Sequence, residues 1–497
     1  MESQASEQAE TSDSQHDVQG DTQNDARLHR IGLPSAAAIV AASMIGAGVY
    51  TTSGFTIASL QSPGWVMVAW AVAGVIAICG ALCYGALAKA FTDSGGEYLF
   101  LSKTVHPIAG LMAGWVSLLA GFTGPIAYAA KTFESYLSEA PWVGRLGLNA
   151  IVQRPGMTAS VIVLCAAVFH SIGLRRGARI QDLVVLIKFL MIGLFLVIAF
   201  TAIGSWQGLQ EADAGVLETS AASAEVATTD ETENDAKTST LAFVVMFANS
   251  LMWIALSYSG FNAAVYVAGE VDRPERNVPR ALLLGTLLVT LVYLLLNAVF
   301  VYAPTRESIA GQPNVATIAA AAVSEAFPED SQLGGGRLTE WVRLLIMCGL
   351  FTSVSALVMT GPRVYAKMAA DGYLPRWMNF QGNVPVVSIW FQAVLGILVI
   401  QFTRLKSLLD YLSFTLAVSA ALTASVVFVL HRRPDSPVKV PWYPLPPIVF
   451  VGGTLLSATF TGIDKPQSAI VALATLLLGA LMYPWYLDRR STADTNG

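Results

Sequence analysis

Twelve long apolar runs alternate with shorter polar stretches along the chain. A membrane-spanning helix needs about 20 consecutive, mostly apolar residues. The runs that meet this requirement cover residues 35–59, 63–89, 107–133, 157–174, 179–203, 240–268, 281–303, 338–368, 385–402, 405–430, 446–462 and 467–487. The pattern predicts an all-α polytopic membrane protein with 12 transmembrane helices. A soluble protein would have to bury all of these runs in one core.

The polar remainder is concentrated in the ends and in one loop. Residues 1–30 and 205–238 are acidic and poor in apolar residues, and they supply much of the net charge of −5. This composition predicts disorder for residues 1–30 and a solvated loop for residues 205–238. Because residues 1–30 lack a basic segment followed by an apolar one, we expect no signal peptide. The predicted organisation is a disordered acidic tail over 1–30, a membrane domain over 31–490 and a second tail over 491–497.

The positive charges predict the orientation. An even number of spans places both termini on one side, and lysine and arginine near helix ends favour the cytoplasm. With the termini inside, the pairs Arg175–Arg176 and Arg432–Arg433 fall on the cytoplasmic side. The sequence thus predicts a multi-pass plasma membrane protein with both termini cytoplasmic. Short loops without targeting signals favour a bacterial inner membrane.

Two of the apolar runs are interrupted near their centres. The first contains MIGAGVYTTS, with Gly46 and Gly48, and the sixth contains SYSGFN, with Gly260. Glycine inside a helix costs about 1 kcal/mol relative to alanine. Interrupted segments at matching positions in two halves indicate a transporter built from an inverted repeat. Non-helical backbone at that depth is tolerated where it lines a cavity. The alternative is that these small residues only let helices pack closely.

Four stretches carry a family resemblance: MIGAGVYTTSGF, GGEYLFL at 95–101, SYSGFNAAVYVAGEVDRPERNVPRAL and FTSVSALVMTGPRVYAKMAADGYLP at 351–375. The chain resembles the amino acid–polyamine–organocation (APC) superfamily of transporters. The resemblance implies a LeuT-like 5+5 inverted repeat bundle with broken first and sixth helices. The first repeat would cover residues 35–203 and the second 240–430, with two extra helices over 446–487.

The resemblance also implies a substrate site at the two breaks. The substrate carboxylate would meet backbone amides at the first break, where helix amino ends favour anions. The substrate amine would meet carbonyl groups of both breaks. The implied substrate-binding residues are Ser43, Met44, Gly46, Ala47, Gly48, Leu256, Ser257, Tyr258, Ser259 and Gly260.

Lys188 lies in the middle of the fifth apolar run. It is about 13.5 Å along a helix from Arg179, at 1.5 Å per residue, so it falls near the middle of a hydrocarbon core about 30 Å thick. An ionisable residue at that depth indicates a functional site. The resemblance implies that Lys188 replaces a sodium ion, reaching the first break and Ser353 as an ion-coupling pair. It would act either as a fixed positive charge or as a proton carrier. The alternative is a structural pairing with backbone carbonyls.

The sequence favours transport of neutral amino acids. No acid lies near the centre of the first, third, sixth, eighth or tenth run, and a cationic side chain in a dry pocket would want a counter-charge. We therefore expect a sodium-independent secondary active transporter that works by alternating access, with proton symport and exchange both open. The alternatives are a transporter-like amino acid sensor, or the same fold carrying another solute such as a polyamine.

Other partners and chemistries find no support in the sequence. We expect no enzyme activity, because catalytic motifs such as HExxH are missing, and no cofactor or metal. No basic patch suggests nucleic acid, whereas membrane lipid surrounds the helices. All four cysteines lie in apolar runs, and residues 134–156 contain none, so we expect no disulfide-linked partner subunit.

Overall fold

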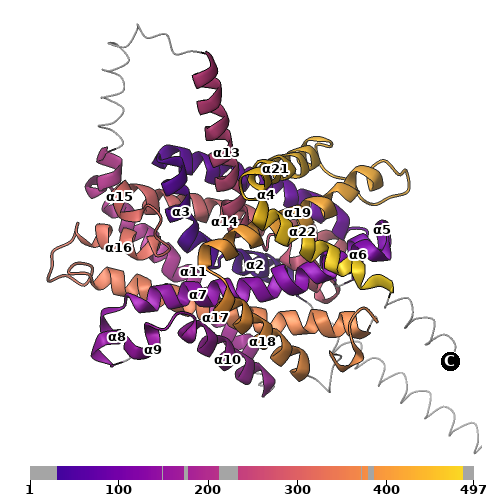
Figure 1. Ribbon diagram of the computed structural model, residues 1–497, viewed down its shortest axis with the longest axis horizontal. Helices are drawn as coiled ribbons and strands as arrows, with labels where there is room; N and C mark the ends of the chain where they lie inside the picture. Colours follow the sequence, from indigo (N-terminus) through magenta and orange to yellow (C-terminus); the bar gives the residue numbers. More distant parts are fainter. Residues whose placement is uncertain are drawn as a thin grey trace, which may run out of the picture.

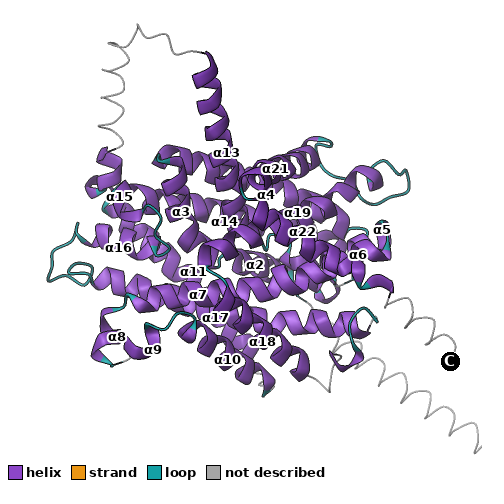
Figure 2. Cartoon of the chain, viewed as in Figure 1, coloured by secondary structure: helices purple, strands orange, loops and turns teal. Residues whose placement is uncertain are grey.

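The computed structural model describes residues 31–93, 95–147, 149–172, 177–211, 233–370, 372–378 and 385–484. Within these ranges every regular element is a helix (Figure 2). The one bridge between extended residues there joins Ile31 to Val271. The two predicted tails, 1–30 and 491–497, lie outside the described residues.

Helices occupy all of the predicted apolar runs. The long helices that match single runs are α4 (Pro63–Ala88), α10 (Met157–Ser171), α11 (Gly177–Thr201), α14 (Pro274–Tyr302), α17 (Arg337–Ala370), α18 (Val386–Phe402), α19 (Leu405–Leu430) and α22 (Pro466–Leu481). Two runs are each built from three consecutive helical elements. The run 107–133 contains α6 (Pro107–Val116), η1 (Ser117–Thr123) and α7 (Gly124–Ser138). The run 446–462 contains α20 (Leu445–Pro447), η5 (Ile448–Gly452) and α21 (Gly453–Asp464). Seven helices of the described chain are long and apolar enough to cross a membrane. The protein is therefore polytopic, while the full set of 12 spans stays a prediction.

The first run is a broken helix. α2 (Leu33–Met44) and α3 (Ala47–Leu60) are bent by 42° relative to each other. The bend lies at Ile45 and Gly46, whose backbone leaves the helical region: Ile45 has ψ 85° and Gly46 has ψ −154°. The predicted break at this point is thus present.

The sixth run is broken as well. α13 (Glu233–Tyr258) ends in a turn at Gly260, which has φ +97°, and the chain continues as the 3-10 helix η3 (Ala263–Glu270). α13 begins at Glu233 rather than at 240, so the end of the acidic stretch predicted to be a loop is helical. In addition, a short helix that the sequence did not predict, α5 (Gly96–Thr104), precedes α6.

The helices form one body with two ends, which are named here for use below. The N-face is the end where α2 begins, and it carries Ile31 beside Val271. The far face is the end where α3 finishes, and there Arg306 donates to the carbonyl of Gln61 at 3.1 Å. The far face also carries α8 (Pro141–Arg145), α9 (Asn149–Val152), α15 (Arg306–Ile309) and α16 (Val315–Ser324), on the left of Figure 1.

Candidate functional site

The two helix breaks touch each other in the middle of the body. A Cβ atom on Gly48 would lie 2.6 Å from the Oγ and 2.9 Å from the Cα of Ser257. A Cβ on Gly260 would lie 2.9 Å from the carbonyl oxygen of Ser43. Contacts this short leave no room for a side chain. The glycines that interrupt the two apolar runs therefore let the breaks approach to backbone contact.

Tyr293 of α14 joins the two breaks by hydrogen bonds. Its hydroxyl lies 2.6 Å from the carbonyl oxygen of Met44 and 2.9 Å from that of Ser257, and donates to this pair. The residue is fully buried. Sequence reasoning missed Tyr293, although a tyrosine inside the apolar run LVTLVYLLLNAVF is a visible signal, because a buried phenol needs a hydrogen-bond partner.

Lys188 reaches the first break, as predicted from the resemblance. Its amine donates to the carbonyl of Ile45, the residue at which the α2 helix ends. The Lys188 side chain is 5% exposed. Its carbon chain packs against Gly349 of α17, where a Cβ atom added to the glycine would lie 3.7 Å from the lysine Cδ. Ser353 lies one turn further along α17. Its Oγ would be 3.8 Å from a Cβ atom added to Gly46. The cation, the break and the serine hydroxyl are thus neighbours.

A cavity of about 1730 Å³ connects the breaks to the N-face. Nearly all of the predicted substrate-binding residues line it: Ser43, Met44, Gly46, Ala47, Gly48, Leu256, Tyr258, Ser259 and Gly260. Lys188 and Ser353 line it too, whereas Ser257 does not and faces Thr52 at 3.3 Å instead. The lining continues to Ile31, Asp93 and Lys103 at the N-face. Because site and vestibule are continuous, the volume exceeds the 300–1,000 Å³ or so of an enclosed ligand pocket.

The break supplies backbone groups of both polarities. α3 begins at Ala47 without any side-chain cap, so its first amide groups have no partner within the helix. Such an amino end favours an anion. The carbonyl of Leu256, in contrast, already accepts from the amide and hydroxyl of Ser259, at 3.1 and 2.6 Å. Ser43, in the last turn of α2, lines the cavity, and carbonyls of a last helical turn have no partner within their helix. The cavity therefore offers amides of α3 and a carbonyl of α2 within one small region, which suits a zwitterion.

Tightly packed polar contacts close the molecule beyond the breaks. On α3, Thr51 shares a 2.5 Å hydrogen bond with Tyr128 of α7, and the carbonyl of Tyr50 accepts from Tyr136 at 2.9 Å. The cavity lining includes Tyr128 but neither Tyr50 nor Tyr136. The structure is thus open to the N-face and shut toward the far face.

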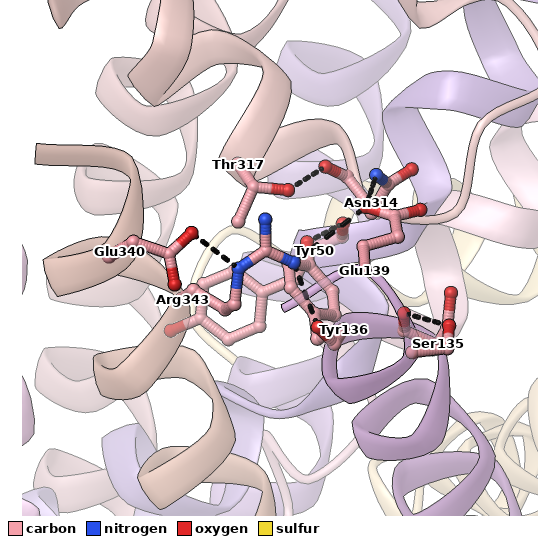
Figure 3. A network of polar contacts seen from close by, with 9 residues as sticks. Tyr50, Ser135, Tyr136, Glu139, Asn314, Thr317, Glu340 and Arg343 are labelled. Atoms are coloured by element: carbon pink, nitrogen blue, oxygen red, sulfur yellow. Dashed lines mark hydrogen bonds and ion pairs between the residues drawn. The ribbon is translucent and has the colours of Figure 1, made fainter. Parts of the chain in front are cut away.

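Arg343 of α17 is the centre of a charged cluster on the shut side (Figure 3). The side chain is 5% exposed. It donates to Glu340 at 3.2 Å and to the carbonyl of Tyr136 at 2.8 Å, and lies 3.8 Å from Glu139. Glu139 in turn accepts from Asn314, which precedes α16. The cluster ties α7, α16 and α17 together at the far face.

A second cluster lies on the same side. Asp410 of α19 accepts from Lys465 at 2.7 Å and from the indole of Trp253 at 2.5 Å. The Lys465 ammonium also lies 4.1 Å from the ring centroid of Trp253. The contacts join α13 to α19 and to the turn between α21 and α22.

A polytopic helical protein with two touching helix breaks at the end of a one-sided cavity has the architecture of a membrane transporter. The family described as "Amino acid permease" matches residues 31–481. The human "Large neutral amino acids transporter small subunit 2" is 24% identical to this chain, over an alignment that covers 91% of this chain and 79% of the human protein. The mouse "b(0,+)-type amino acid transporter 1" is also 24% identical, over 91% and 86%. The "Serine/threonine exchanger SteT" of Bacillus subtilis (strain 168) is 24% identical, over 95% and 100%.

The chain belongs to the amino acid permease family. Its function is amino acid transport across a membrane, which is not an enzymatic activity. The match covers nearly all of the described residues, so the helix breaks and the cavity both lie within the family region.

Proposed function

We propose that this protein is a sodium-independent transporter of neutral amino acids that works by alternating access across a plasma membrane. The observation that carries the proposal is the cavity that ends at two touching helix breaks, with the amine of Lys188 held on one of them. The N-face is the cytoplasmic side, as the distribution of lysine and arginine favours, so the described conformation is open to the cytoplasm. The membrane is a bacterial inner membrane.

The proposed architecture is the LeuT-like 5+5 inverted repeat with 12 transmembrane helices. Its main support is the pairing of the α2–α3 break with the α13–η3 break, since equivalent interruptions in two halves are typical of inverted repeats. Three helices, α10, α18 and α22, have 15, 17 and 16 residues and would cross a locally thin bilayer or extend by non-helical residues.

The substrate's two charged ends would be held at the breaks. The carboxylate would accept from the uncapped amides of α3 at Ala47 and Gly48, beside Gly46, whose own amide donates to the carbonyl of Met44 at 2.8 Å. The ammonium would donate to carbonyl groups at Ser43 and near Ser259. The carbonyl of Ser257 keeps one lone pair beside the bond to Tyr293, whereas the carbonyl of Met44 accepts from both Tyr293 and the amide of Gly46.

Lys188 would serve as a fixed cation where sodium-coupled transporters bind an ion. Its amine already bonds the carbonyl at which α2 ends, and Ser353 lies beside the same break. A metal cation at this break would compete for the same carbonyl oxygen, which the lysine amine already occupies. The lysine therefore takes the place of the ion, and transport needs no sodium.

Neutral substrates are favoured by the relatives. Two of the relatives are named for substrates with uncharged side chains, namely large neutral amino acids and serine or threonine. We therefore expect uptake of neutral amino acids.

Uptake of a pool of labelled amino acids into proteoliposomes tests the proposal. Uptake should be equal in sodium and choline buffers. Stimulation by an inward proton gradient would assign symport, and a requirement for an amino acid inside the vesicle would assign exchange. Binding without uptake would favour the sensor alternative, and uptake of a polyamine instead would replace the substrate class.

A further inference from the structure

Glu97 is a buried carboxyl that no step above uses. It stands in the first turn of α5, directly after Gly95 and Gly96, whose φ angles are +155° and +59°. A Cβ on Gly96 would lie 2.3 Å from the ring of Tyr266, so only glycine allows this approach to η3. The turn carries Glu97 into the body, where it is 6% exposed and lines the cavity.

Three neutral donors from three elements surround the carboxyl. The hydroxyl of Tyr84 on α4 donates to Oε1 at 2.6 Å, and the amide of Asn262, just after the α13 break, donates to the same oxygen at 3.2 Å. The hydroxyl of Ser419 on α19 donates to Oε2 at 3.0 Å. An ionised carboxylate only accepts hydrogen bonds, so this arrangement fits the ionised form.

No cation compensates the charge within the described part of the chain. Towards Glu97, α4 and η3 present the phenols of Tyr84 and Tyr266. α6 contains no titratable residue, and α19 contains none after Tyr411. On the segment of Glu97 itself, Asp93 and Lys103 pair with each other at 3.2 Å on the surface. Burial raises the pKa of Glu97 above the ordinary glutamate value, and the three hydrogen bonds oppose part of this rise.

We propose that the carboxyl of Glu97 is a proton-binding site of the cavity. Its ionised form links the segment after the α13 break to α4 and α19 through the three hydrogen bonds that it accepts. The proton comes from solution through the N-face opening and converts the carboxylate to a carboxylic acid. The amide of Asn262 can only donate, so protonation weakens its bond to Oε1. The segment after the break then moves more freely against α4 and α19.

Infrared titration of the purified protein tests the site without any transport assay. Wild type should show a carboxylic acid C=O band that titrates above the ordinary pKa of glutamate, and Glu97→Gln should lack this band. Tyr84→Phe removes one donor to the ionised form, so the midpoint should rise. Asp93→Asn is the matched control, because Asp93 is an exposed acid on the same segment, and it should leave the band in place. An unchanged band in Glu97→Gln would overturn the proposal.

A transport arm, which rests on the proposed function, tests the coupling. With equal pH on both sides, wild-type uptake should rise by about threefold or more as the pH falls through the midpoint, because a hydrogen bond to a charged group is lost. Glu97→Gln should flatten this profile, and Asp93→Asn should keep it. A Glu97→Gln profile equal to that of wild type would overturn the coupling. If wild type takes up no amino acid, the proposed function fails, and the infrared titration still decides whether Glu97 binds the proton.

Discussion

At the scale of single residues, glycine sets how closely the two breaks can approach. Gly48 and Gly260 stand where a Cβ would overlap backbone atoms of the opposite break. Gly46 has no such conflict, since the nearest atoms to its Cβ position are 3.8 and 3.9 Å away. Gly48 and Gly260 therefore allow the two breaks to come into contact. Gly46 instead adopts the extended backbone that precedes α3 and leaves the first amides of this helix uncapped.

Gly48→Ala should separate the breaks. The methyl group would lie within 2.9 Å of the Cα of Ser257, and overpacking of this kind costs about 1–3 kcal/mol. We expect a lower melting temperature and strongly reduced uptake. Gly193→Ala on α11 is the control, because nothing lies within 4 Å of its Cβ position. Equal melting temperatures for the two variants would contradict the account.

Lys188→Ala should reduce uptake by about tenfold or more, since about 1.4 kcal/mol of lost interaction corresponds to a factor of ten. The variant leaves the carbonyl of Ile45 without its cation. Lys131→Ala is a matched control, because the Lys131 amine also donates to a backbone carbonyl, that of Ile400 at 2.8 Å, but away from the cavity. Full uptake with unchanged pH dependence in Lys188→Ala would reduce Lys188 to a structural residue.

At the scale of elements, the sequence predicted the helices of the long apolar runs and both breaks, because each run is long enough to span and each break has its own glycine. It did not predict the short helices α5, α8, α9, α15 and α16. It did not predict which helix joins the breaks. Tyr293 does so from α14, and apolar periodicity carries no information about the partner of a buried hydroxyl. Glu97 was missed for a similar reason, since it lies outside the long apolar runs and enters the cavity only through the turn at Gly95 and Gly96.

Tyr293→Phe should loosen the contact between α2 and α13. Two buried carbonyls lose their shared donor, at a cost of about 1–3 kcal/mol. We expect a lower melting temperature in detergent and several-fold slower uptake. Tyr302→Phe, on the same helix and partly exposed, should change neither. A Tyr293→Phe variant as stable and active as Tyr302→Phe would refute the bridging role.

Arg343→Met should weaken the closure of the far face. Glu340 and Glu139 are 32% and 42% exposed, so solvent screens the loss of their ion pairs with Arg343. The buried carbonyl of Tyr136 loses its donor, which costs about 1–3 kcal/mol. The exposed Arg306, 3.9 Å from Glu307, gives the control Arg306→Ala, since exposed pairs contribute about 0–1 kcal/mol. The melting temperature should fall clearly in the first variant and little in the second. Equal falls in melting temperature for the two variants would show that the Arg343 cluster does not hold the far face closed.

At the scale of the whole molecule, the described conformation is one end state of the proposed alternating-access cycle. The cavity opens to the N-face, and the clusters of Arg343 and Asp410 shut the far face. Alternating access would require these clusters to part while the N-face closes around the breaks. The order of apolar runs predicted a membrane bundle but not this state, because the difference between the two ends lies in polar contacts between distant segments.

The central claim is that the paired breaks bind the amino and carboxylate groups of a neutral amino acid without sodium. Thermal stabilisation of the purified protein by each of the 20 amino acids in sodium-free buffer tests it most directly, followed by the amide and the N-acetyl derivative of the best ligand. We predict stabilisation by neutral amino acids and none by either derivative, because each derivative removes one charged end. Stabilisation by the derivatives, or only in the presence of sodium, would contradict the account.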